Sequence, residues 1–141
     1  MTSNQQPNWQ PISMLSFVAQ HLTEGLEAAQ ENLENFQRAK DRPGSLDDCT
    51  VERAISVYSR QADDLWVFHE QLARWRELNL TIEQSNSLGE AEKNLNRLEA
   101  TIKELMPLLY KLRSSTIDKI LGMSDMEVAL NVLSGKLKSP T

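Results

Sequence analysis

Apolar residues recur along most of the chain at alternating steps of three and four positions, which is the spacing of one face of an α-helix. The most regular series has eight members: Leu88, Ala91, Leu95, Leu98, Ile102, Leu105, Leu109 and Leu112. A heptad pattern sustained over more than three repeats is typical of helices that pack as coiled coils. We therefore expect a helix over 87–113, with Ser87 and Glu90 forming a capping box at its start.

Two earlier series of the same spacing predict two more long helices. We place them at about 12–41 and 47–79, where residues such as Leu22 and Leu65 mark the apolar face. Between them stands Pro43-Gly44, and both residue types disfavour a continuing helix. Because the connection is short, the two helices should be antiparallel neighbours, with facing positions whose numbers sum to about 87.

Pro107 lies inside the third series. A proline in a helix interior costs roughly 3 kcal/mol. At about 100° per residue, however, Pro107 falls about 160° from the apolar face, so the carbonyl that it frees can meet water. We expect a kink here rather than the end of the helix. Beyond Leu112 the pattern predicts short helices at about 115–121 and 125–134.

Together these patterns predict an all-α fold. It is an up-down-up bundle of three long helices with coiled-coil-like packing, plus one or two short C-terminal helices. The chain has 141 residues, which suffice for one hydrophobic core and not for two, so 11–141 should form a single domain. Residues 1–10 are polar and contain proline, and we interpret them as a flexible arm with Trp9 as its one possible anchor.

The charge distribution argues against nucleic acid as a partner. The net charge is −5, and the first 80 residues carry seven Lys and Arg against twelve Asp and Glu, whereas the remainder carries eight of each. A domain that binds nucleic acid usually presents a basic stripe, and none is visible in this pattern.

Other features of the sequence indicate the compartment. No charge-free apolar stretch reaches the roughly 18 residues that a membrane-spanning helix needs, so we expect no membrane association. The first seven residues lack the basic and apolar regions of a secretory signal. Cys49 is the only cysteine, so no internal disulfide can form and a reducing compartment fits best. We expect a cytoplasmic protein. In its general character the sequence resembles those of small bacterial all-helical proteins.

Metal motifs are incomplete. The di-iron pattern Glu-x-x-His fails because Val18 and Trp66 occupy the glutamate positions before His21 and His69. The His-Glu-x-x-His pattern of zinc proteases fails because Ala73 stands where the second histidine belongs. We therefore expect no cofactor.

A looser alternative remains, in which the helical hairpin brings His21, Glu24 and His69 together to bind a metal or a small ligand. The competing interpretation is structural, with His69 as a residue of the helix seam that uses one ring nitrogen and His21 at its flank.

Nucleophilic catalysis has weak support. Cys49 stands in the first turn of the second helix, where the helix dipole favours a thiolate, but Asp47, Asp48 and Glu52 surround it with negative charge. The sequence contains no Gly-x-Ser-x-Gly motif, no phosphate-binding glycine loop and no dinucleotide fingerprint. We do not expect an enzyme.

The stretch 63–77 carries an unusually wide apolar arc, bounded by Trp66 and Trp75 about 180° apart. A helix in a three-helix bundle needs an apolar face only a little wider than about 100°. We therefore predict a homodimer, with another protein as the alternative partner. The candidate interface residues are Leu65, Trp66, Phe68, His69, Leu72, Trp75, Leu98 and Leu105. The predicted function is that of a non-catalytic interaction or scaffold module acting through apolar helix faces.

Overall fold

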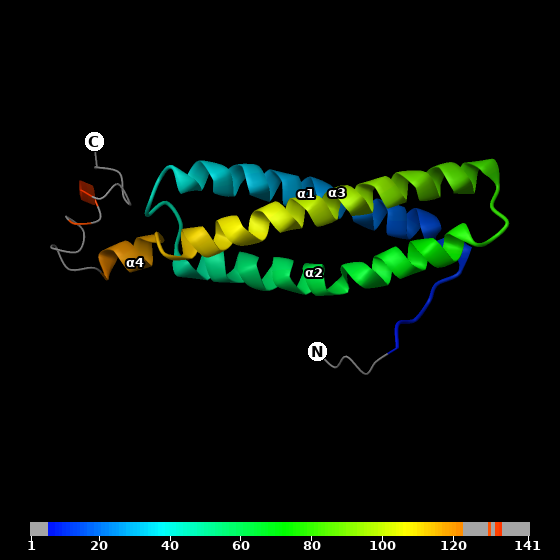
Figure 1. Ribbon diagram of the computed structural model, residues 1–141, viewed down its shortest axis with the longest axis horizontal. Coiled ribbons are helices and arrows are strands. Elements are labelled where there is room, and N and C mark those ends of the chain that lie inside the picture. Colours follow the sequence, from blue (N-terminus) through cyan, green and yellow to red (C-terminus); the bar gives the residue numbers. More distant parts are fainter. Residues whose placement is uncertain (1–5, 123–129, 131, 134–141) are drawn as a thin grey trace.

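The computed structural model describes residues 6–122, 130 and 132–133. That part of the chain contains helices and no strand. In chain order the elements are a 3-10 turn η1 (Ile12–Met14), α1 (Leu15–Lys40), α2 (Asp48–Arg76), α3 (Ile82–Arg113) and α4 (Ile117–Leu121). The three long helices run up, down and up, and α4 lies at the end where α2 begins (Figure 1). The expected all-α bundle is confirmed.

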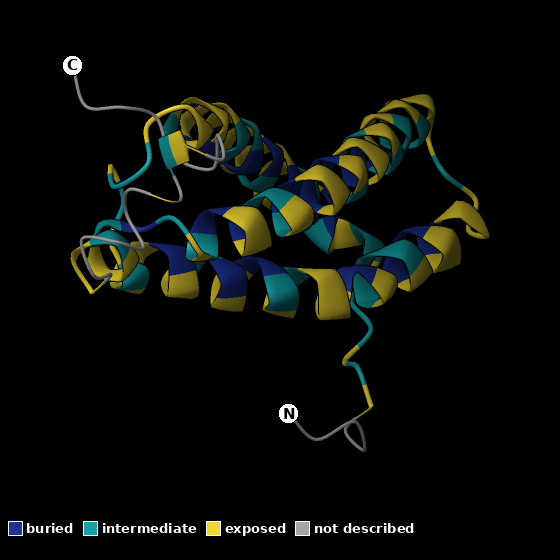
Figure 2. Ribbon diagram, turned by 60° about the vertical axis from the view of Figure 1, so that its left-hand side comes forward, coloured by how far each residue is buried: buried dark blue, intermediate teal, exposed yellow. Residues whose placement is uncertain are grey.

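α3 is the central helix of the bundle. It packs closely along both α1 and α2, whereas the backbones of α1 and α2 approach each other at few points. All eight positions of its heptad are buried. Figure 2 shows the buried positions on the sides of the helices that face one another and the exposed positions on the outside. The heptad therefore forms the core of a single chain.

α1 and α2 meet through side chains. The His21 and Phe68 rings stack with centroids 5.6 Å apart, and Asn32 Nδ2 donates to the Tyr58 hydroxyl at 2.5 Å. The numbers of these facing pairs sum to 89 and 90, close to the expected value of about 87. The two helices are antiparallel as expected. The backbone of each, however, packs more closely on α3 than on the other.

α3 begins earlier than the sequence pattern indicated. Its N-cap is Thr81, whose hydroxyl accepts from the Gln84 amide at 3.1 Å, while the Gln84 side chain accepts from the Thr81 amide at 3.0 Å. This capping box replaces the predicted one at Ser87 and Glu90, which lie inside the helix. The earlier cap prevails because residues 82–86 contain neither glycine nor proline and can continue the helix.

Pro107 is exposed and does not end the helix, because α3 continues to Arg113. Its position on the outer face agrees with the expectation from the heptad. The predicted helix over 125–134 falls largely outside the described residues. Among the described helices, none is long and apolar enough to cross a membrane.

The N-termini of α2 and α4 are joined by reciprocal hydrogen bonds. The Asp48 amide donates to Asp118 Oδ2 at 2.6 Å, and the Thr116 hydroxyl donates to Asp48 Oδ1 at 2.6 Å. Lys119 Nζ donates to the second Asp48 oxygen at 2.8 Å. Side chains of each helix thus accept hydrogen bonds from amide or hydroxyl groups of the other. These bonds hold the five-residue α4 against the end of the bundle.

Candidate functional site

The outer surface of α2 carries an exposed aromatic group. The Trp66 side chain is 57% exposed, and the Trp9 ring lies against it in a T-shaped arrangement, with ring centroids 6.5 Å apart and an angle of 77° between the planes. The Arg74 guanidinium lies 4.3 Å from the Trp9 ring centroid, in cation–π geometry. We call these three residues the Trp9–Trp66–Arg74 cluster.

Trp75, at the other edge of the wide apolar arc, is buried to 2% exposure. The N-terminal arm covers it: the Gln10 carbonyl accepts from Trp75 Nε1 at 2.9 Å, and Gln71 Oε1 accepts from the Gln10 amide at 2.6 Å. The arm therefore supplies the neighbour that the sequence pattern appeared to lack. With this arm in place, the wide arc of α2 no longer requires a second chain on the Trp75 side.

The other candidate interface residues divide by burial. Leu65, Leu72, Leu98 and Leu105 are buried within the single chain. Phe68 and His69 are half-buried. Of the eight residues proposed from the sequence, Trp66 alone is exposed. A surface for a second chain on this part of α2 must therefore be built around Trp66, not around the α3 heptad.

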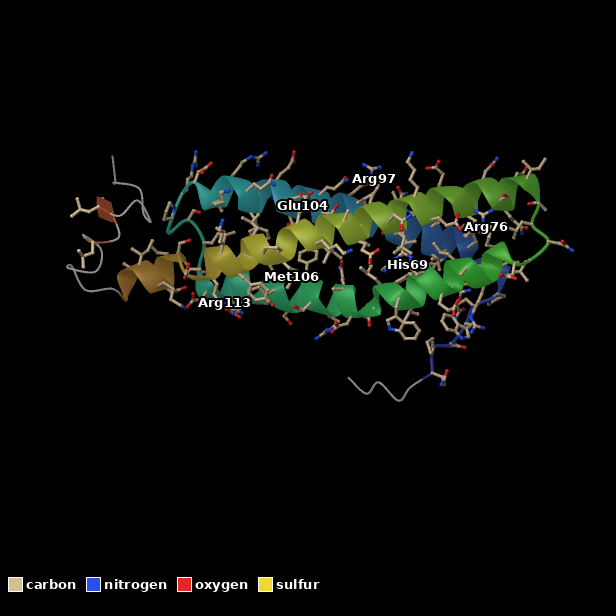
Figure 3. All side chains as sticks on the ribbon, in the orientation of Figure 1. His69, Arg76, Arg97, Glu104, Met106 and Arg113 are labelled. Atoms are coloured by element: carbon tan, nitrogen blue, oxygen red, sulfur yellow. The ribbon has the colours of Figure 1, made fainter. Side chains whose placement is uncertain are left out.

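The structure places His21 and Glu24 beside one pocket and separates His69 from both of them. His21 stacks on Phe68, and Glu24 accepts a hydrogen bond from Gln20 Nε2 at 3.0 Å on the same helix. His69 instead faces α3, with its Nε2 atom 3.2 Å from Glu99 Oε1 (Figure 3). Within the described part of the chain, no three His, Cys, Asp or Glu side chains are grouped so that they could hold a metal ion.

The reason for this separation is rotational. Successive residues of a helix are turned by about 100°, so Phe68 and His69 face different neighbours. Phe68 takes the position towards α1, and His69 points to α3. The pairing of positions across the hairpin predicted correctly which residues lie at the same level along the bundle axis. It could not predict which neighbouring helix each side chain faces.

Next to His21 and Glu24 lies a pocket between α1 and α2, with α3 at its base and a volume of about 430 Å³. Its other polar residues are Gln61 and Asp64, both from α2. Gln61 Oε1 is a buried oxygen with no hydrogen-bond partner among the described residues. We call this cavity the α1–α2 pocket.

Gln61, Asp64 and Gln10 were missed by sequence reasoning, which named only Trp9 in the N-terminal arm. One feature of the sequence could have pointed to Gln61. It lies between Tyr58 and Leu65 on the apolar side of α2, where a polar side chain needs a hydrogen-bond partner or a functional role. In the sequence, Asp64 cannot be distinguished from the other charged residues on the exposed side of the helix. The role of Gln10 depends on a fold of the arm that no helical periodicity encodes.

Cys49 is exposed at the start of α2, and the Arg53 guanidinium donates to its sulfur at 3.7 Å. Both residues belong to the same helix, one turn apart. This contact is a local interaction on the helix surface. It does not bring a base or a second polar group from another element to the sulfur.

Two exposed ion pairs connect α2 to α3 near opposite ends. Arg76 Nη2 lies 2.6 Å from Glu92 Oε1, and Arg113 Nε lies 2.7 Å from Glu52 Oε1. The Glu92 carboxylate raises the pKa of the Arg76 guanidinium above its ordinary value. Exposed pairs of this kind contribute little to stability individually, but bidentate geometry defines the register of the helices.

Comparison with known proteins finds no relative for this chain, since no family model, curated protein or solved structure matches it significantly.

Proposed function

We propose that this protein is a non-catalytic interaction or scaffold module that assembles as a homodimer through the outer face of α2. The observation that carries the proposal is the exposure of Trp66, at 57%, in the second half of that helix. Removing such a large apolar side chain from water on association is favourable. Tryptophan and arginine are also the residue types that most often dominate the binding energy of protein interfaces.

The surroundings of Trp66 favour binding because they are already ordered. Trp9 forms a T-shaped pair with it, and the Arg74 guanidinium lies over the Trp9 ring, 4.3 Å from its centroid. An aromatic group fixed before association loses less conformational entropy on binding than a mobile one. The cluster thus resembles a pre-formed contact point rather than a scattered exposed side chain.

Small residues flank Trp66 on the same face of the helix. Ala62 and Ala73 are both exposed, and at 100° per residue they lie about 40° and 20° from the direction of Trp66. Small side chains at these places, one before and one after Trp66 along α2, let a second helix approach closely beside the indole. A second copy related by a two-fold axis would present the same surface to itself, and closed dimers are the commonest oligomers.

The proposal includes a cytoplasmic location. Its support is the single exposed Cys49, which suits a reducing compartment because it has no partner for an internal disulfide in the sequence. A different protein could bind the same face of α2. The mass of the purified chain separates this alternative from the homodimer.

The sharpest mutational test compares two substitutions on the same helix. Trp66→Glu places a charge in the proposed interface and should weaken dimerisation by about 30-fold or more, as expected for an interface residue worth about 2 kcal/mol. Val57→Glu is the matched control, because Val57 is 45% exposed on α2 and points to the opposite side of the helix from Trp66. Sedimentation equilibrium measures both dissociation constants, and circular dichroism checks that both variants keep their helix content.

The proposal predicts a dissociated Trp66→Glu variant and an intact Val57→Glu dimer. Equal dissociation constants for the two variants would contradict an interface centred on Trp66. If Val57→Glu alone dissociated, the interface would lie on the opposite side of α2.

A further inference from the structure

The α1–α2 pocket has the dimensions of a small-molecule site. Its volume of about 430 Å³ falls in the range of cavities that bind small ligands, and all three long helices contribute to its walls. It lies on a different side of α2 from Trp66, because Gln61 and Asp64 are turned away from the indole direction by more than about 100°. The pocket is therefore independent of the proposed dimer surface.

The base and walls of the pocket are apolar. Leu22, Leu65 and Leu98 come from the three different helices and are all buried. Gly25 also lines the pocket, and a Cβ atom at that position would lie 3.8 Å from Leu98 Cδ2, so the missing side chain leaves space directly above the base. On one wall the Phe68 ring stacks with the His21 ring at an angle of 19° between the planes.

The polar groups of the pocket are mostly hydrogen-bond acceptors. Glu24 and Asp64 contribute carboxylates from opposite sides, and both residues are exposed. Gln61 Oε1 is buried away from water and has no donor among the described residues, so the two carboxylates are the acceptors that a ligand can reach. The described lining residues include no lysine or arginine. A ligand that complements this pocket must therefore bring a positive charge.

We propose that the α1–α2 pocket binds a small organic cation, with an ammonium group on an aromatic or branched aliphatic body. The body covers the leucine base, while the ammonium lies between the carboxylates of Glu24 and Asp64. The stacked Phe68 and His21 rings add aromatic surface to the wall beside the ligand body. Charge and shape complementarity both define this ligand class, and neither rests on the homodimer.

The test is a charge series on one carbon skeleton. 2-Phenylethylammonium, the neutral 2-phenylethanol and the anionic 3-phenylpropanoate are titrated into the full chain, with binding followed by chemical shifts of the backbone amides. The cation should bind saturably and at least about fivefold more tightly than the alcohol, and the anion more weakly still. The shifted amides should cluster at the lining residues of α1 and α2.

Variants then assign the charge effect to the pocket. Asp64→Asn should weaken binding of 2-phenylethylammonium by about fivefold and leave 2-phenylethanol unchanged, because an exposed carboxylate contributes up to about 1 kcal/mol to such a pair. Asp63→Asn is the matched control: it removes the same charge from the neighbouring residue, which does not line this pocket. Its affinity for the cation should stay within twofold of the wild type.

Three results would overturn the proposal. The first is the absence of saturable binding by the cation, and the second is equal affinity for all three compounds. The third is an equal loss of affinity in Asp63→Asn and Asp64→Asn, which would show a general effect of negative surface charge. None of these outcomes depends on whether the chain is a monomer or a dimer.

Discussion

The Gln61 side chain contains a buried polar atom that lowers the free energy of unfolding of the protein. Its Oε1 atom is buried without a hydrogen-bond partner among the described residues, next to the leucine base of the α1–α2 pocket. A buried acceptor that has lost water and gained no donor costs about 1–3 kcal/mol. Most buried polar groups in native structures have a hydrogen-bond partner, so this oxygen should be a local source of instability.

Gln61→Met should therefore stabilise the protein. Methionine has a similar length and helix propensity but no buried amide oxygen, so the free energy of unfolding should rise by about 1 kcal/mol. Urea denaturation followed by circular dichroism measures this change. The control is Gln37→Met, an exposed position on α1 where the effect should stay within about 0.5 kcal/mol.

A loss of stability in Gln61→Met would mean that the amide makes a favourable interaction in solution. In that case the buried oxygen would not be an unpaired acceptor in the folded protein.

Individual residues were predictable where a regular pattern determined them. The α3 heptad predicted buried side chains at Leu88 and Leu105, because a sustained stripe can be satisfied only by packing. Trp66 and Trp75 could not be told apart, since each lies at an edge of the apolar arc. The difference comes from Gln10, a residue of a non-helical segment whose position the periodicity does not encode.

At the scale of elements, the junction between α2 and α4 combines capping with charge. Lys119, and then the Thr116 hydroxyl, donate to Asp48 and lower the pKa of its carboxyl group below the ordinary value of 3.8. A carboxyl group whose folded-state pKa is lowered contributes stability above its unfolded-state pKa, and that contribution is lost as the pH falls through the folded value. The junction should therefore be intact at neutral pH and weaken below about pH 4.

Asp48→Asn should loosen α4 at neutral pH without unfolding the bundle. The amides of α4, such as that of Ile120, which donates to the Thr116 carbonyl, should exchange with solvent faster than in the wild type. Hydrogen exchange followed by NMR measures this, and amides in the middle of α3 should keep their protection. As the pH falls below the folded-state pKa of Asp48, the variant and the wild type should converge.

Asp47→Asn is the control for this measurement. Asp47 caps α2 by accepting from the Thr50 amide at 2.7 Å, and asparagine is an equally good cap. Its α4 amides should exchange as in the wild type. Unchanged exchange in Asp48→Asn as well would contradict the view that the Asp48 side chain holds α4 in place.

The limits of element prediction have a specific physical cause. Two capping sequences precede the heptad of α3, one at Thr81 and one at Ser87, and both have the required residue types. Nothing local distinguishes them, because the intervening residues tolerate a helix. The chain uses the earlier cap, which shortens the connection to α2 and lengthens the helix by five residues relative to the range expected from the heptad.

At the scale of the whole molecule, the arrangement of the helices explains both proposed surfaces. α3 packs along both neighbours, and α1 and α2 meet mainly through side chains, which leaves room for the α1–α2 pocket. Among the described helices, none covers Trp66, whose side chain is 57% exposed. The up-down-up order was predictable from the three apolar series, whereas the central position of α3 depends on packing between elements.

The central claim is that the Trp66 face of α2 joins two copies of the chain. Sedimentation equilibrium of the wild-type protein over micromolar to submillimolar concentrations tests it most directly. We predict a mass that reaches twice that of the 141-residue chain within this range. A mass that stays at that of one chain throughout the range would contradict the claim.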